Sequence, residues 1–124
     1  MEIKFAIDIF FVKSYIYNRS LKVLKKIKPE LPLSRIAVFC KRWKIKEFSI
    51  FGSILREDFN PDSDVDVLLS FMEDAPWGLF EFIDMKDELK TIFGRQVDIV
   101  EKEGLKNPFR KHEIFRTRKV IYAA

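Results

Sequence analysis

The sequence predicts one main domain of the mixed α/β class, and three observations support this prediction. Segments with apolar residues at helical spacing alternate with short apolar runs that are typical of strands. Glycines lie where two of these segments end, at Gly52 and Gly94. The chain has 124 residues, of which 48% are apolar, and this is enough for one modest core. We therefore expect a mixed α/β domain without repeats or low-complexity segments.

The expected elements follow from local patterns. Apolar residues after Pro32 recur at helical spacing, and a later apolar run stops at Gly52, as a short strand would. The run that begins at Asp64 first alternates strictly and then becomes apolar, which predicts a strand with one functional edge. In order, we expect helix 33–43, strands 48–51 and 64–71, helix 77–93, strand 96–100, helix 108–116 and strand 120–122.

The N-terminal segment differs from the rest. We expect residues 1–28 to be a leader or helical extension, and residues 29–124 to form the main domain. Apolar residues at positions 5, 9, 12 and 16 give the leader a rough helical stripe. Charges interrupt its most apolar part, residues 3–17, which also lacks a small-residue cleavage site. We therefore expect no membrane span, no signal peptide and a cytoplasmic protein.

Cysteine and histidine usage excludes several chemistries. Cys40 is the only cysteine, so it has no partner for an internal disulfide, and a reducing compartment is expected. His112 is the only histidine, which excludes zinc sites and Ser-His-Asp catalysis. We expect Cys40 in the core and His112 on a solvent-facing helix surface. Catalysis must therefore come from carboxylates, hydroxyls, cations or a bound metal.

Charge is unevenly distributed along the chain, although the net charge is only +4. Residues 1–50 contain twelve Lys or Arg and four acids, whereas residues 51–100 contain four Lys or Arg and twelve acids. Residues 101–124 return to a balance of +4. Solvated helix faces explain such blocks, but a site that binds cations through carboxylates and polyphosphate through basic residues also has this pattern.

Three aspartates carry the main functional indication. Asp64 and Asp66 are two residues apart on a predicted strand, so their side chains lie on one face and repel each other unless a cation lies between them. Asp98 lies in an otherwise apolar strand, where a charge is costly unless it faces a metal or a partner. If the two strands are neighbours, the three carboxylates converge. Such a group suits Mg²⁺ or Mn²⁺, which also hold substrate phosphates.

The segment before these aspartates has features of a phosphate-binding turn. Gly52 and Ser53 follow a strand and are expected to open a short helix. Glycine lacks a side chain that would block a phosphate, and free N–H groups at a helix start bind anions. Arg56, one turn later, can neutralise polyphosphate or brace the acidic loop.

This combination resembles the nucleotidyltransferase superfamily that includes the polymerase-beta-like enzymes. Their signature is Gly-Ser, ten residues and then Asp-x-Asp, and residues 54–63 supply the ten. More narrowly, the chain resembles the minimal nucleotidyltransferases (the MNT family), in which Gly-Ser-x-x-Arg precedes Ser-Asp-x-Asp and a later strand adds a third aspartate. The resemblance covers residues 33–123, with Glu57 where the family often has glycine.

The resemblance implies a nucleotidyltransferase fold with a small mixed sheet flanked by helices. It implies Mg²⁺, or alternatively Mn²⁺, as cofactor and a nucleoside triphosphate, ATP, as substrate. The implied catalytic and metal-binding residues are Asp64, Asp66 and Asp98, and the implied nucleotide-binding residues are Gly52, Ser53, Arg56 and Ser63. In addition, Asp98 would help to deprotonate the acceptor hydroxyl.

The resemblance also implies a protein partner. MNT proteins are typically antitoxins paired with HEPN proteins, and they can transfer AMP to a tyrosine of the HEPN ribonuclease and silence it. The chain has no room for the additional domains of larger relatives, so we expect a hetero-oligomer in which the toxin completes the site.

Two other functions remain open at this point. The first is a non-enzymatic antitoxin or binding subunit that neutralises its partner by occlusion. The second is nucleotidyl transfer to a small molecule or to RNA, since Phe109-Arg110-Lys111 and Phe115-Arg116 combine aromatic and basic residues. Helical spacing explains those aromatic residues equally well as core.

Overall fold

The computed structural model describes residues 31–124, and the predicted leader helix lies outside the described residues. The elements are α3 (Leu33–Arg42), β1 (Ile45–Phe51), the short 3-10 helix η1 (Gly52–Leu55), β2 (Val65–Phe71), α4 (Leu79–Phe93), β3 (Val97–Glu101), the 3-10 helix η2 (Lys102–Gly104), α5 (Pro108–Thr117) and β4 (Lys119–Ala123). Each predicted helix and strand of this region is present, including the short helix at Gly52. No helix within residues 31–124 is long and apolar enough to span a bilayer.

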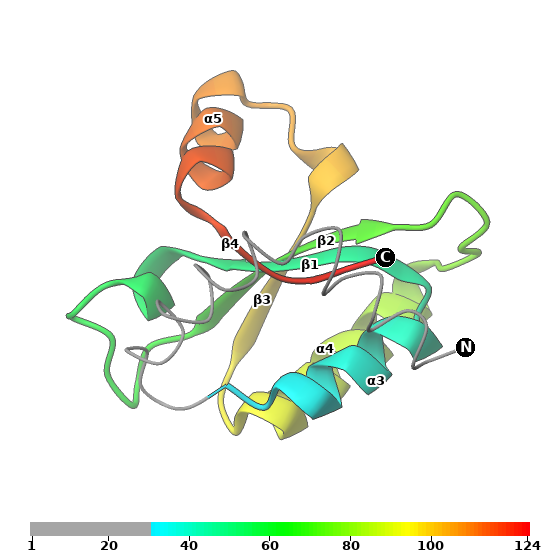
Figure 1. The fold of residues 1–124 in the computed structure, drawn as a ribbon, viewed down its shortest axis with the longest axis horizontal. Coiled ribbons are helices and arrows are strands. Elements are labelled where there is room, and N and C mark those ends of the chain that lie inside the picture. Colours follow the sequence, from blue (N-terminus) through cyan, green and yellow to red (C-terminus); the bar gives the residue numbers. More distant parts are fainter. Residues whose placement is uncertain (1–30) are drawn as a thin grey trace.

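The four strands form one mixed sheet in the order β3-β2-β1-β4. β1 pairs antiparallel with both β2 and β4, whereas β2 and β3 are parallel. A parallel pair needs a long crossover, and α4 provides it. α3 and α4 lie on one side of the sheet and α5 lies on the other (Figure 1). The fold is therefore α+β, as the sequence predicted.

The strand alternation distributes side chains between two apolar clusters. Val65 and Val67 belong to the larger cluster, between the sheet and the two helices α3 and α4, which also contains the fully buried Cys40. Leu68 points to the other face, where it joins a smaller cluster with Ile114 of α5. Asp66 has the same parity as Leu68, so the strand directs its side chain to the α5 side of the sheet.

The long helix begins two residues later than the sequence indicated. Trp77 and Gly78 precede the helix and are not part of it. Trp77 is fixed by tertiary contacts, since its indole N–H donates to the Trp43 carbonyl oxygen (2.7 Å) and the two rings pack edge to face. The other end confirms the expected cap: Gly94 has φ +69° and donates its N–H to the Lys90 carbonyl oxygen at 2.8 Å.

The aromatic residues of α5 are not core as a group. Phe109 is 84% exposed, so the core interpretation is wrong for this residue. Phe115 is half-buried and packs against the smaller cluster. Phe109 lies in the first turn of α5, whereas Ile114, the buried residue of this helix, lies in a later turn. His112 is exposed, as expected.

Two buried serines predict stability changes of opposite sign. Among residues 31–124, Ser49 Oγ is fully buried and has no hydrogen-bond partner, whereas Ser70 Oγ donates to Glu103 Oε1 at 2.7 Å. We expect Ser49→Ala to raise the free energy of unfolding by about 1 kcal/mol, because it removes an unsatisfied polar atom. Ser70→Ala should lower it by about 1 kcal/mol. Urea denaturation of both variants tests this, and a destabilised Ser49→Ala protein would contradict it.

Candidate active site

The three predicted aspartates lie at one end of the sheet. Asp66 and Asp98 are direct register partners on the parallel strands β2 and β3, and Asp66 is also the register partner of Phe51 at the end of β1. Asp64 immediately precedes β2 and shares the parity of Asp66. The fold therefore brings the aspartates from residues 64–66 and from residue 98 to adjacent strands, on the side of the sheet that faces α5.

Gly52 approaches the Asp66 carboxylate more closely than any other residue type could. Its φ is +74°, a conformation that side chains of L-residues rarely adopt. A Cβ atom placed on Gly52 would lie 2.3 Å from Asp66 Oδ2 and 3.3 Å from Asp66 Cγ. The turn between β1 and η1 thus packs its bare backbone directly against the central carboxylate.

The remaining predicted site residues have mainly local contacts. Ser53 Oγ donates to the Asp64 carbonyl oxygen at 3.3 Å, which links the Gly-Ser turn to the start of β2. Arg56 Nε donates to Asp58 Oδ1 at 3.2 Å, although both side chains are mostly exposed. Ser63 Oγ accepts a hydrogen bond from the Asn60 N–H at 3.1 Å. Ser63 therefore uses its hydroxyl within the loop.

Electrostatics at the site favour a cation. Partial burial raises the pKa of the Asp66 carboxyl group above its ordinary value of 3.8, and the neighbouring charges of Asp98 and Asp64 raise it further. The cations Arg110 and Arg56 act in the opposite direction and lower the pKa. The carboxylates of Asp64 and Asp98 therefore repel that of Asp66, and a bound cation would reduce this repulsion.

Burial of Asp66, together with this repulsion, predicts a pH-dependent effect of Asp66→Asn on stability. The raised pKa means that the folded state disfavours ionised Asp66, so the penalty is present at neutral pH and decreases as pH falls through the folded-state pKa toward 3.8. We expect Asp66→Asn to have a higher Tm than the unaltered protein at pH 7 in metal-free buffer. The difference should vanish below pH 3.8, where both states carry a protonated Asp66. Thermal unfolding across this pH range measures it, and a lower Tm of the variant at pH 7 would be the contrary result.

Two arginines near the site were not among its predicted residues. Arg110 lies in the first turn of α5, and its positive charge acts to lower the pKa of Asp66. Arg95, just before β3, donates from Nη1 to the carbonyl oxygens of Asn60 (2.8 Å) and Ser63 (3.2 Å). Arg110 was recognised only as part of a basic segment, and Arg95 has no sequence signature because its partners are backbone atoms.

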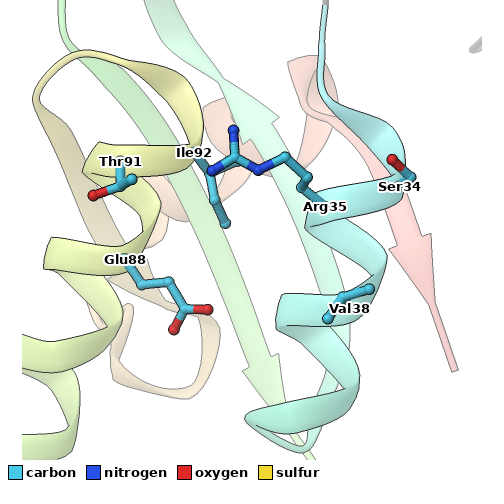
Figure 2. Close-up of a pocket in the computed structure, with 6 residues that line it drawn as sticks. All are labelled: Ser34, Arg35, Val38, Glu88, Thr91 and Ile92. Carbon is cyan, nitrogen blue, oxygen red and sulfur yellow. The ribbon is translucent and has the colours of Figure 1, made fainter.

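Two hollows bear on the position of the site, and the lining of one of them includes Gly52, which packs against Asp66. A cleft of about 500 Å³ lies between η1 and α5, and it includes Gly52, Arg56, Arg116 and Lys119 in its lining. A second hollow, of about 410 Å³, lies between α3 and α4, where the Arg35 side chain reaches across toward Ile92 and Glu88 projects from α4 (Figure 2). Because α3 and α4 cover the opposite side of the sheet, the first cleft is the candidate nucleotide site (Figure 1).

The donor set fits a divalent cation, but the side chains do not converge as they stand. Within residues 31–124, no three Asp, Glu, His or Cys side chains are grouped closely enough to hold an ion. Asp64 and Asp98 are exposed, so rotation about their side-chain bonds is unhindered by core packing. Carboxylate oxygens on adjacent strands, with mutual repulsion at Asp66, are the hard ligands that Mg²⁺ prefers.

Similarity to known proteins identifies the family of the chain. The nucleotidyltransferase domain family matches residues 33–121. The protein adenylyltransferase MntA of Thermococcus cleftensis is 37% identical over 82 residues, which cover 66% of this chain and 78% of the relative.

Two solved structures share the fold. One is a toxin–antitoxin with AMP-PNP (TM-score 0.62, 14% identity, 76% of this chain and 75% of that chain). The other is a complex of a tri-AMPylated HEPN toxin of Shewanella oneidensis with an MNT antitoxin (TM-score 0.55, 14% identity, 74% of this chain and 70% of that chain). The extent of the family match, with the sequence similarity to MntA, decides the assignment: the chain belongs to the nucleotidyltransferase domain family, as a minimal nucleotidyltransferase.

Proposed function

We propose that this chain is an antitoxin that transfers AMP from ATP to a tyrosine of a partner HEPN-type toxin, in a reaction that depends on Mg²⁺. The observation that carries the proposal is the register pairing of Asp66 with Asp98 directly beside the bare backbone of Gly52. The resemblance to a protein adenylyltransferase at 37% identity supports the choice of a protein acceptor. The cytoplasm is the proposed compartment, since the single buried thiol suits a reducing environment.

In this proposal, each part of the site has a separate task. Asp64 and Asp66 would hold Mg²⁺, with Mn²⁺ as the alternative, and Asp98 completes the carboxylate set. The ion would neutralise charge on the phosphates. The backbone N–H groups of Gly52 and Ser53 bind the β- and γ-phosphates, and cations near the carboxylates, Arg56 and Arg110, balance the remaining negative charge.

The transfer step itself is a displacement at the α-phosphorus. The acceptor oxygen forms a bond to the α-phosphorus while the bond from that phosphorus to the bridging oxygen breaks. Pyrophosphate leaves with the bonding electron pair, and the hydroxyl proton passes to the Asp98 carboxylate. A phosphodiester link between AMP and the toxin tyrosine results.

The experiment uses ATP labelled at the α-phosphate, Mg²⁺ and a HEPN-type toxin from the same source. The Asp64→Ala/Asp66→Ala protein and an EDTA-treated sample run beside the unaltered protein. Label on the toxin with the intact site, and none from ATP labelled at the γ-phosphate, is the expected result. Mass spectrometry then locates the AMP, and a toxin with phenylalanine in place of that tyrosine should accept none.

Three other outcomes overturn the proposal in different ways. Label on RNA would make the chain an RNA nucleotidyltransferase, and label on a small molecule would identify that acceptor class. If no label moves and the Asp64→Ala/Asp66→Ala protein still neutralises the toxin, occlusion of the partner is the function.

A further inference from the structure

Arg95 contacts three residues of the loop that leads to Asp64. Its Nη1 donates to the carbonyl oxygens of Asn60 at 2.8 Å and Ser63 at 3.2 Å. Its guanidinium carbon lies 4.4 Å from the centre of the Phe59 ring, so the planar group also stacks on an aromatic face. Arg95 is half-buried and lies between Gly94, the cap of α4, and the first residue of β3. One side chain thus ties the loop to the strand that carries Asp98.

The loop's own hydrogen bonds close it on itself. The Ser63 N–H donates to the Asn60 carbonyl oxygen at 3.0 Å, and the Asn60 N–H donates to Ser63 Oγ at 3.1 Å. The Asp62 N–H donates to Asn60 Oδ1 at 2.9 Å. These bonds set the shape of residues 60–63, but they do not fix this unit relative to the sheet.

Asp64 depends on external attachments because it lies just outside the strand ladder. The β2–β3 pairing begins at Val65 with Val97, and the β1–β2 pairing ends at Asp66. On its C-terminal side, the Val65 N–H donates to the Gln96 carbonyl oxygen at 2.9 Å. On its N-terminal side, the Arg95 bond to the Ser63 carbonyl oxygen is the corresponding tie. Residues 95 and 96 therefore hold both neighbours of Asp64.

We propose that Arg95 is a positioning residue, which fixes the Phe59–Ser63 loop so that the backbone of Asp64 stays beside the strand that carries Asp98, where rotation of the two side chains can bring both carboxylates to one cation. This inference rests on the proposed function for its catalytic part. An arginine is needed because its guanidinium can bond two carbonyl oxygens and stack on a ring at once, whereas a lysine ammonium offers a point charge without a planar face. The phosphate contacts proposed for Gly52 and Ser53 are separate from these contacts of Arg95.

The test compares Arg95→Met, Arg95→Lys and Arg42→Met. Arg42 is a matched control, since it also lies near an aromatic ring, Trp43, and pairs with Glu88, but it precedes the start of β1, whereas Asp66 lies at the end of β1. For each protein, kcat, KM for ATP and the half-saturating Mg²⁺ concentration are measured in the toxin-labelling assay. Hydrogen exchange of the Asp62, Ser63 and Val65 amides is followed separately, without substrate.

For Arg95→Met we expect kcat to fall by about 30-fold, because displacements of about 1 Å can cost up to about 100-fold. KM for ATP should change by less than about 3-fold, the half-saturating Mg²⁺ concentration should rise, and the three amides should exchange faster. Arg95→Lys should lie between Arg95→Met and the unaltered protein, and Arg42→Met should match the unaltered protein in all four readouts.

The inference is overturned if Arg95→Met keeps the unaltered kcat and Mg²⁺ dependence, or if its loop amides exchange at the unaltered rate. If Arg95→Met does not fold, Arg95→Lys decides: a normal kcat overturns the inference and a lowered kcat with raised Mg²⁺ demand supports it. If even the unaltered protein transfers no AMP, the proposed function fails, and the exchange rates alone decide whether Arg95 holds the loop.

Discussion

Replacing Asp66 with asparagine is expected to lower the rate of AMP transfer by about 10³-fold, equivalent to about 4 kcal/mol of transition-state stabilisation. Asparagine has nearly the same shape, so the register with Asp98 and the contact with Gly52 remain. The variant loses one negative charge, and with it one of the proposed hard oxygen ligands for the cation. Asp98→Asn should lose activity by a similar factor, because it removes both a charge and the proposed proton acceptor.

The matched control for both variants is Asp74→Asn. Asp74 lies beyond the opposite end of β2, where it pairs with Lys44 at 2.8 Å and is mostly exposed. The same chemical change there should leave kcat within about 2-fold, since exposed ion pairs contribute little. Initial rates at saturating ATP and Mg²⁺ measure all three. Activity above about a tenth of the unaltered value in Asp66→Asn would show that this carboxylate does not hold the ion.

Gly52→Ala is expected to lower kcat by about 100-fold while it costs about 1 kcal/mol of stability. The added methyl group would lie 2.3 Å from Asp66 Oδ2, so the carboxylate must move away from the position that the fold gives it. The stability cost has a separate origin, because an alanine at this position is strained by the φ of +74°. Steady-state kinetics and urea denaturation measure the two effects independently.

The Gly94→Ala variant separates the effect of backbone strain from the effect of displacing the Asp66 carboxylate. Gly94 has nearly the same backbone conformation, φ +69°, but a Cβ atom there would meet nothing within 4 Å. This control should therefore show a similar loss of stability with unaltered kcat. Equal kcat values for the Gly52→Ala and Gly94→Ala proteins would mean that the close approach to Asp66 has no catalytic role.

Local sequence patterns predicted most of the fold because most of its elements are locally determined. Gly94 ends its helix through a backbone conformation that glycine favours, and the alternation from Asp64 onward predicts a strand with two faces. The start of α4 was placed two residues too early because Trp77 satisfies its indole N–H through Trp43, a contact across 34 residues. A periodicity argument contains no information on such a contact.

The candidate residues of the site were named from the sequence, but their geometry could not be. Asp66 and Asp98 were identified from residue type and strand context, yet their exact pairing depends on how the α4 crossover sets the register of β3. Arg95 could not be identified from the sequence, because its hydrogen-bond acceptors are backbone carbonyl oxygens, which every residue has. The influence of Arg110 on Asp66 arises only after Ile114 docks α5 against the sheet.

Because Cys40 is buried, the rate at which its thiol reacts with a reagent measures how often the interior of the protein opens. Its side chain is fully covered, and burial raises the pKa of the thiol, so the reactive thiolate is scarce in the closed protein. A thiol reagent can label it only through an opening of the larger cluster, and the labelling rate therefore reports the free energy of that opening. Because no other cysteine competes for the reagent, each variant discussed above can be assayed for interior opening without an engineered probe.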